Sequence, residues 1–154
     1  MELYIGGYAQ GKLNYVKKKY GLHDIGMAMK QPTDVCNHYI VLDGETLECK
    51  TEAQRIQLKE MYGDQMVILN HFHLWVKKEL LAGENVTSQM DMILELFPNL
   101  VIISDELGNG IVPMEKQDRV YRETTGRCLV SLAASAKRVE RIFCGIGQVL
   151  KSEK

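Results

Sequence analysis

A glycine-rich stretch near the start of the chain has residue types and spacing that suit a bound phosphate. Gly6 to Lys12 read G-G-Y-A-Q-G-K, which fits the pattern G-x-x-x-x-G-K. Glycines let the backbone curl around an anion, so that several N–H groups point at it without a Cβ in the way. A following helix adds its N-terminal amides, and Lys12 adds a full charge for the outer phosphates. The stretch therefore predicts a site for a nucleoside triphosphate, GTP or ATP, formed by Gly6, Gly7, Tyr8, Ala9, Gln10, Gly11, Lys12 and Leu13.

Acidic and amide side chains follow two strongly apolar runs. Asn70 comes directly after M-V-I-L, and Asp105 and Glu106 come after L-V-I-I-S. A kinase needs a carboxylate that holds Mg²⁺ or orients the attacking hydroxyl, and a hard cation prefers anionic oxygens. Leu13 has no hydroxyl for the ion, so we expect Asp105 to be a ligand and Asp105 or Glu106 to be catalytic. The alternative is an acidic turn at the end of a strand.

Two histidines and two arginines complete the candidate set. His71 and His73 come directly after Asn70, where they are candidate catalytic residues that donate to phosphate. Equally, they could cap the next helix and line a polar seam. Arg119 and Arg122 are three residues apart, so they share a helix face, and their planar forks suit a phosphate or the polar arm of a substrate. The alternative for the arginines is pairing with neighbouring carboxylates in solvent.

Strand-like and helix-like segments alternate along the chain, which predicts an α/β fold with a mostly parallel sheet. Gly145-Ile146-Gly147 is expected to break the last strand, and Pro32 favours a loop over residues 22–37. The lysine run at 17–19 predicts a solvated helix face. Strands are expected at residues 3–5, 38–42, 66–69, 100–103 and 139–144. Helices are expected at residues 12–20, 52–61 (capped by Thr51), 71–81, 86–97 and 115–136.

Length and composition narrow the class of protein. The 154 residues indicate one domain, residues 1–154, and the net charge of −1 gives no reason to expect a nucleic-acid partner. No apolar run approaches the length of a membrane span, and the N-terminus does not resemble a secretory signal. The four cysteines are widely spaced, which favours reduced thiols in a cytoplasmic protein over a zinc site.

Taken together, two blocks of the sequence resemble the adenosylcobinamide kinase/adenosylcobinamide-phosphate guanylyltransferase family of cobalamin biosynthesis. Residues 5–12, I-G-G-Y-A-Q-G-K, are similar to its G-G-x-x-S-G-K-S opening, and residues 101–113, V-I-I-S-D-E-L-G-N-G-I-V-P, are similar to an apolar strand followed by N-E-V-G-x-G-I-V-P. The resemblance implies a P-loop NTPase (RecA-like) three-layer α/β/α fold and a homo-oligomer. It also implies a kinase that uses GTP or ATP with Mg²⁺ to phosphorylate the aminopropanol hydroxyl of adenosylcobinamide, a corrinoid. GMP transfer through a guanylyl-histidine would follow. The family has a metal-binding aspartate where this chain has Asn70, so the resemblance implies Asn70 as the second Mg²⁺ ligand beside Asp105.

The chain departs from this family at the nucleophilic histidine. The family has R-I-x-x-H, whereas Arg55-Ile56 is followed by Lys59, which leaves His71, His73, His23 or His38 as substitutes. We therefore carry forward the kinase step rather than the guanylyl step. One alternative is an altered relative that binds nucleotide or corrinoid without turnover. Another is an unrelated regulatory α/β module in which the glycine turn is fortuitous.

Overall fold

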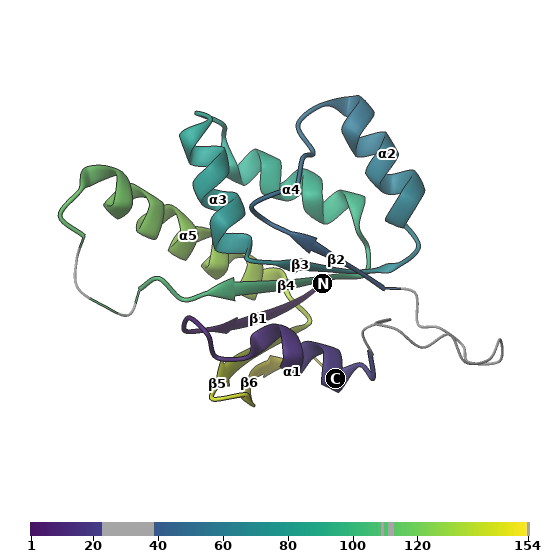
Figure 1. Ribbon diagram of the computed structural model, residues 1–154, viewed down its shortest axis with the longest axis vertical. Coiled ribbons are helices and arrows are strands. Elements are labelled where there is room, and N and C mark those ends of the chain that lie inside the picture. The colour runs from purple at the N-terminus through teal and green to yellow at the C-terminus, as the bar shows by residue number, and fades with distance from the viewer. Residues whose placement is uncertain (23–38, 109, 111–112, 154) are drawn as a thin grey trace.

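A six-stranded sheet organises the chain in the computed structural model, which describes residues 1–22, 39–108, 110 and 113–153 (Figure 1). The strands lie in the order β2-β3-β4-β1-β5-β6, and every neighbouring pair is parallel except β5 and β6. Their bounds are β1 Glu2–Gly6, β2 Tyr39–Asp43, β3 Met66–Asn70, β4 Leu100–Asp105, β5 Arg138–Phe143 and β6 Ile146–Ser152. The prediction of an α/β fold with a mostly parallel sheet is confirmed.

Helices lie on both faces of the sheet. Figure 1 shows α1 on one face and the other four described helices on the opposite face. The helices are α1 Lys12–Lys19, α2 Glu52–Tyr62, α3 Phe72–Leu81, α4 Val86–Leu96 and α5 Lys116–Ser135. Thr51 caps α2 as expected, because its hydroxyl accepts from the Gln54 N–H and the Gln54 side chain accepts from the Thr51 N–H. None of the helices in the described part of the chain is long and apolar enough to cross a bilayer.

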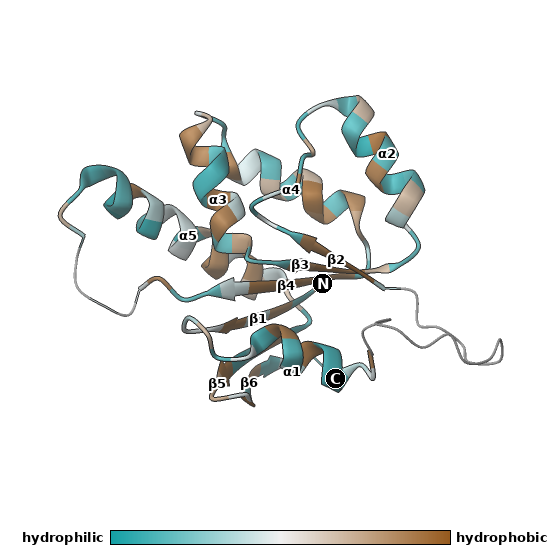
Figure 2. Ribbon diagram, in the orientation of Figure 1, coloured by the Kyte–Doolittle hydropathy of each residue, from teal (hydrophilic) through white to brown (hydrophobic). Residues whose placement is uncertain are grey.

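Two apolar cores follow from this arrangement (Figure 2). The larger core packs α3, α4 and α5 against the sheet, and Trp75, stacked on Phe72, is fully buried in it. The smaller core packs Val16 of α1 against the other face of β1, β3 and β4. All six residues of β4 are buried, which explains why this strand is an almost unbroken apolar run in the sequence.

The expected elements are present, with ends shifted by one or two residues, and one further strand was not predicted. The pair Gly145 and Gly147 indicated a break, whereas the chain reverses there and continues as β6. Cys144 and Gly145 both have positive φ, 51° and 76°, which is the backbone that a two-residue hairpin turn requires. The loop expected at residues 22–37 lies outside the described residues except for Leu22.

The chain segments that follow β1 and β4, which are neighbours in the sheet, lead to opposite faces and in opposite directions along the sheet. From β1 the chain crosses towards β2 by way of α1, and from β4 it crosses towards β5 by way of α5 on the other face. Gly6 at the end of β1 is paired in register with Asp105 at the end of β4. Such a divergence leaves a crevice outside the carboxyl ends of the strands, where open α/β sheets bind ligands.

Candidate active site

The glycine loop, residues 6–12, joins β1 to α1 in a conformation that exposes its backbone. Ala9 and Gly11 have positive φ, 55° and 75°, and Gly11 is the N-cap of α1. The Gly7 carbonyl accepts from Lys12 Nζ at 2.7 Å, and the Gln10 carbonyl accepts from the Gly145 N–H at 3.0 Å. Both contacts use carbonyl oxygens, so they leave the N–H groups of these residues available to an anion at the start of the helix.

Two contacts hold this loop against the β5–β6 turn. The Gln10 side-chain carbonyl accepts from the Cys144 N–H at 2.6 Å, so Gln10 anchors the loop. A Cβ at Gly6 would lie 2.4 Å from the Ile142 carbonyl oxygen, so glycine is required for this close approach to β5. Tyr8, at the tip of the loop, is almost fully exposed. Leu13 packs against the smaller core.

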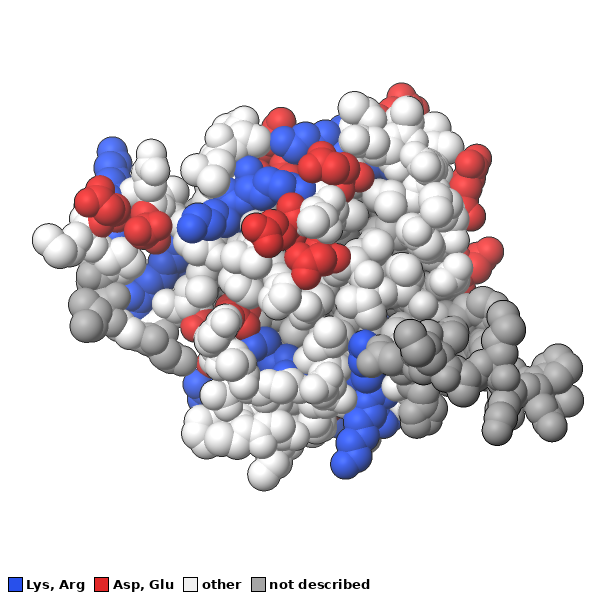
Figure 3. Space-filling model, in the orientation of Figure 1, with Lys and Arg blue, Asp and Glu red and all other residues white. Residues whose placement is uncertain are grey.

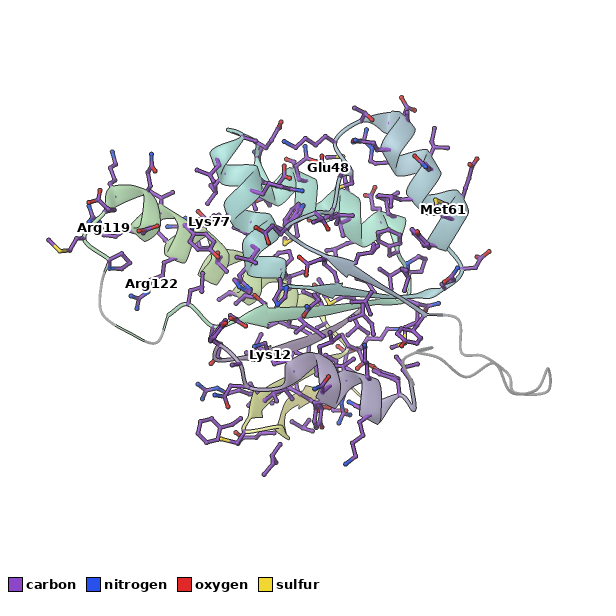
Figure 4. All side chains as sticks on the ribbon, viewed as in Figure 1. Lys12, Glu48, Met61, Lys77, Arg119 and Arg122 are labelled. Carbon is purple, nitrogen blue, oxygen red and sulfur yellow. The ribbon has the colours of Figure 1, made fainter. Side chains whose placement is uncertain are left out.

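Lys12, the first residue of α1 (Figure 4), forms an ion pair with Asp105 at the end of β4. Its Nζ lies 2.5 Å from Asp105 Oδ1, and the lysine side chain is only 8% exposed. A buried charge without a partner is costly, so each of these two groups depends on the other. The ammonium therefore sits beside the loop, and a phosphate bound there could take the place of the carboxylate as its counter-ion.

His73 lies on the far side of Asp105 from Lys12. The backbone N–H of Asp105 donates to His73 Nδ1 at 3.2 Å, and His73 Nε2 lies 3.7 Å from Asp105 Oδ2. Because Nδ1 accepts, the neutral ring carries its proton on Nε2, on the side that faces the carboxylate. Burial lowers the pKa of His73, and the charge of Asp105 offsets part of that effect. His73 is therefore a neutral donor at neutral pH.

His71 is the exposed histidine of the pair. It is the N-cap of α3 with φ 54°, and its Nδ1 lies 2.7 Å from Asp43 Oδ2 at the end of β2. Its side chain is 46% exposed, and its ring lies edge-on to the His73 ring at 5.9 Å between centroids. The carboxylate on Nδ1 fixes the ring, and Nε2 is the nitrogen left for a base or nucleophile, although the Asn70 amide nitrogen lies 3.4 Å from it. Asn70 contacts the same ring through its amide nitrogen.

Sequence analysis did not single out Asp43. It precedes Gly44, and an Asp-Gly pair at the end of a strand is typical of a turn rather than of a site. A Cβ at Gly44 would lie 2.4 Å from the His71 carbonyl oxygen, so the glycine lets the end of β2 approach the start of α3. The only sequence signal for the pairing was that both residues end or follow parallel strands, whose carboxyl ends meet at one edge of the sheet.

Glu106 does not join Asp105. Its Oε2 accepts from Arg141 Nε and Nη2, at 3.0 and 2.8 Å, so the carboxylate is directed towards β5. The two neighbouring acidic residues therefore have different surroundings, one beside Lys12 and one beside an arginine. This division could not be predicted, because it depends on strand order and on which side of the chain each residue points.

Arg119 and Arg122 hold the loop that leads from β4 into α5. Arg119 donates to the carbonyls of Pro113 and Met114, and Arg122 donates to those of Gly108 and Gly110. Figure 4 shows both arginines beside this loop and apart from Lys12. The two arginines share a helix face as predicted. The hydrogen bonds described above go to backbone oxygens, and a role in binding substrate stays a prediction.

The fit of a magnesium ion depends mainly on Asp105. Within the described ranges, no group of three or more His, Cys, Asp or Glu side chains is arranged to hold a metal. Mg²⁺ in a nucleotide site needs only one or two carboxylates, because phosphates and water supply its other ligands. Asp105, at the crevice between β1 and β4, fits that requirement. Leu13 does not, and the Asn70 amide nitrogen is turned towards His71.

Comparison with known proteins assigns the chain to a family. The family model described as cobinamide kinase / cobinamide phosphate guanyltransferase matches residues 43–150. The chain belongs to this family. The match supports a role in cobalamin biosynthesis, as the sequence resemblance had implied, and it begins after the glycine loop. No curated protein matches the chain.

The ion pair can be tested by substitutions that break one or both partners. Lys12→Met leaves the Asp105 carboxylate buried and unpaired, so it should lower the free energy of unfolding by about 3–5 kcal/mol. The double variant Lys12→Met/Asp105→Asn should lose less than the sum of the single variants. Urea unfolding measures each value, and Lys17→Met, on the same helix, is the control. Additive losses would contradict a direct interaction.

Proposed function

We propose that this chain is a cobinamide kinase with a P-loop NTPase (RecA-like) fold, which transfers the γ-phosphoryl group of GTP or ATP to the hydroxyl of the aminopropanol arm. The family match supports the reaction class. The observation that carries the proposal to particular residues is the buried Lys12–Asp105 pair beside the glycine loop. In this proposal the pair supplies a cation and a carboxylate beside the loop amides that would hold the outer phosphates.

Binding and charge neutralisation supply most of the catalysis in this mechanism. The loop amides hold the phosphates, and the Lys12 ammonium exchanges Asp105 for a phosphate oxygen. Asp105 would hold Mg²⁺, which neutralises charge on the phosphates when bound. His73 Nε2–H, facing the same carboxylate, keeps it oriented. Phosphoryl transfer requires little covalent help, so this positioning accounts for much of the rate.

His71 is our candidate for the acceptor side of the site. Its Nδ1 is tied to Asp43, and Nε2, once it parts from the Asn70 amide, would take the proton of the corrinoid hydroxyl as that oxygen attacks the γ-phosphorus. Asp43 acts through the histidine, because it holds the ring and stabilises the charge that forms. The exposure of its side chain makes His71 the described histidine that a guanylyl group would reach.

A second candidate function is binding of nucleotide or corrinoid without turnover. Two observations favour it: Leu13 packs in the core where a metal-binding hydroxyl is usual, and Asn70 contacts a histidine through its amide nitrogen. Both changes weaken the metal site. Turnover of cobinamide with either nucleotide separates the two candidates.

The first test measures phosphorylation of cobinamide by the purified protein with Mg²⁺ and either GTP or ATP. Lys12→Met should reduce kcat/KM by about 100-fold or more, because the charge on the transferred phosphoryl group loses its main counter-ion. Lys17→Met, which removes a charge of the same sign from the same helix, should retain activity. Nucleotide binding by the wild type with no product would favour the binding-only candidate.

A second test asks whether His71 acts as the base. His71→Gly removes the ring at a backbone position that glycine prefers, and should lower kcat by about 100-fold with little change in nucleotide affinity. Added imidazole should restore part of the rate. Asp43→Asn should also lower kcat, but added imidazole should not restore the rate, because the His71 ring still occupies its place. Full activity of His71→Gly would contradict this role. A different result would assign His71 to guanylyl transfer instead: the wild type gains the mass of one GMP after incubation with GTP, and His71→Gly does not.

We also propose that the chain forms a homo-oligomer through the edge strand β6. Figure 3 shows few charged side chains over the β5–β6 hairpin, and Phe143, Ile146, Val149 and Leu150 are exposed there. An exposed apolar edge strand is a template for pairing with another copy.

Light scattering with size exclusion tests this interface. The wild type should have the mass of an oligomer, and Val149→Lys should shift it to the monomer because a charge is buried at the edge. Val130→Lys, at an exposed apolar position on α5, is the control. A monomeric wild type would reject the proposal.

A further inference from the structure

Helix α1 carries the amides that follow the glycine loop, but little apolar packing holds this helix in place. It is the one described helix on its face of the sheet (Figure 1). Of its eight residues, all of which the structure describes, only Lys12 and Val16 are buried. A short helix gains most of its stability from the apolar face that it buries, so α1 has few contacts that fix its tilt and position. A phosphate site nevertheless requires donors held to within about 0.5 Å, so another interaction must orient the helix.

A buried carboxylate on the neighbouring strand supplies this interaction. Glu140 of β5 is fully buried, and its two oxygens accept from different residues of α1. The Tyr15 hydroxyl donates to Oε2 at 2.7 Å, and the Lys19 ammonium donates to Oε1, which also accepts from Arg138 Nε. Because Tyr15 and Lys19 are four residues apart, they are neighbours on the same face of the helix. One carboxylate therefore holds two successive turns of α1.

The carboxylate keeps its charge inside the fold. Burial by itself would raise the pKa of Glu140, but the hydrogen bonds from its three donors outweigh this effect and lower the pKa. A buried ion pair is rarely a source of net stability, since apolar groups of similar volume often serve as well. What the charged contacts add here is a defined geometry, because hydrogen bonds are satisfied only over a narrow range of distance and angle.

Lys19 joins this network instead of the solvated helix face that the sequence predicted for residues 17–19. Its Nζ also donates to the Tyr4 hydroxyl of β1, at 2.7 Å. A Cβ at Gly147 of β6 would lie 2.2 Å from the Tyr15 hydroxyl oxygen, so a larger residue there would displace the ring. The face of α1 that carries these two side chains is therefore fitted to both β1 and the β5–β6 hairpin, and the same hairpin holds the glycine loop through its turn.

From these contacts we propose that Glu140 is a positioning residue for the phosphate site at the glycine loop. It touches no ligand itself. Through Tyr15 and Lys19 it sets how α1 lies on β1 and β5, so that the loop amides and the Lys12 ammonium converge on one point. This inference rests on the proposed function, because it requires phosphates at the loop.

The test measures the affinity and the stoichiometry of inorganic tripolyphosphate on the purified chain by titration calorimetry. Glu140→Gln and Lys19→Met should each weaken binding about 10-fold, which is typical of substitutions that act through a network, and the stoichiometry should stay at the wild-type value. Tyr15→Phe keeps the ring and loses one hydrogen bond, so it should weaken binding by a smaller factor. Lys18→Met removes an exposed charge from the same helix, and this matched control should bind as the wild type does. In turnover, the KM for the nucleotide should rise while kcat at saturating nucleotide and the KM for cobinamide stay unchanged.

A purely structural role for Glu140 would give a different result. Loss of folded protein lowers the stoichiometry and the apparent kcat together, and it leaves the dissociation constant of the remaining sites unchanged. An unchanged dissociation constant in Glu140→Gln and Lys19→Met would overturn the positioning role, as would equal weakening by Lys18→Met. Lys19→Met and Tyr15→Phe keep the carboxylate, so they decide the question if Glu140→Gln does not fold.

The outcomes also separate this inference from the proposed function. Wild-type affinity for tripolyphosphate in every variant would reject the role of Glu140 and leave the phosphate site standing. Failure of the wild type to bind both tripolyphosphate and GTP would overturn the proposed function, and the positioning role with it.

Discussion

The buried pair between Lys12 and Asp105 is the interaction on which the candidate site depends. It joins the loop after β1 to the end of β4, and neither charge has a low-cost alternative in the interior. The pair therefore fixes where the loop lies relative to the neighbouring strand, and it keeps the ammonium near the loop amides. Under the proposed function, a bound phosphate replaces the carboxylate beside Lys12. Breaking the ion pair then costs less free energy, because the ammonium keeps a counter-ion.

The parallel sheet explains why the other polar groups gather around this pair. Asp43, Asp105 and the two histidines come from the ends of three strands or directly after them, and these ends point the same way. Each histidine then has a carboxylate partner, but with opposite consequences. His73 is buried and neutral beside Asp105, whereas His71 is exposed and tied to Asp43. The edge thus offers one side suited to phosphates and one side suited to an acceptor.

Two residues of the glycine loop and its helix that the sequence resemblance did not match have structural roles. Leu13 packs against the smaller core, and Gln10 holds the loop against the β5–β6 turn. The family match begins at residue 43, after the glycine loop. The loop and the matched part of the chain therefore support the proposed function independently of each other. The β5–β6 hairpin, which sequence analysis did not predict, supports the glycine loop and the helix after it. Its turn contacts the loop, and Glu140 of β5 accepts a hydrogen bond from Tyr15 of α1.

Local sequence determined the elements of this protein, because apolar runs, caps and glycines act over a few residues. It therefore predicted five of the six described strands to within two residues, the glycine loop, and the placement of Asp105 and His71 at or directly after strand ends. Only the tertiary structure decided which groups meet. Asp43 with His71, Glu106 with Arg141, and Lys19 with Glu140 pair residues that are far apart in the chain. Their partners depend on strand order and side-chain direction, which no short sequence pattern encodes.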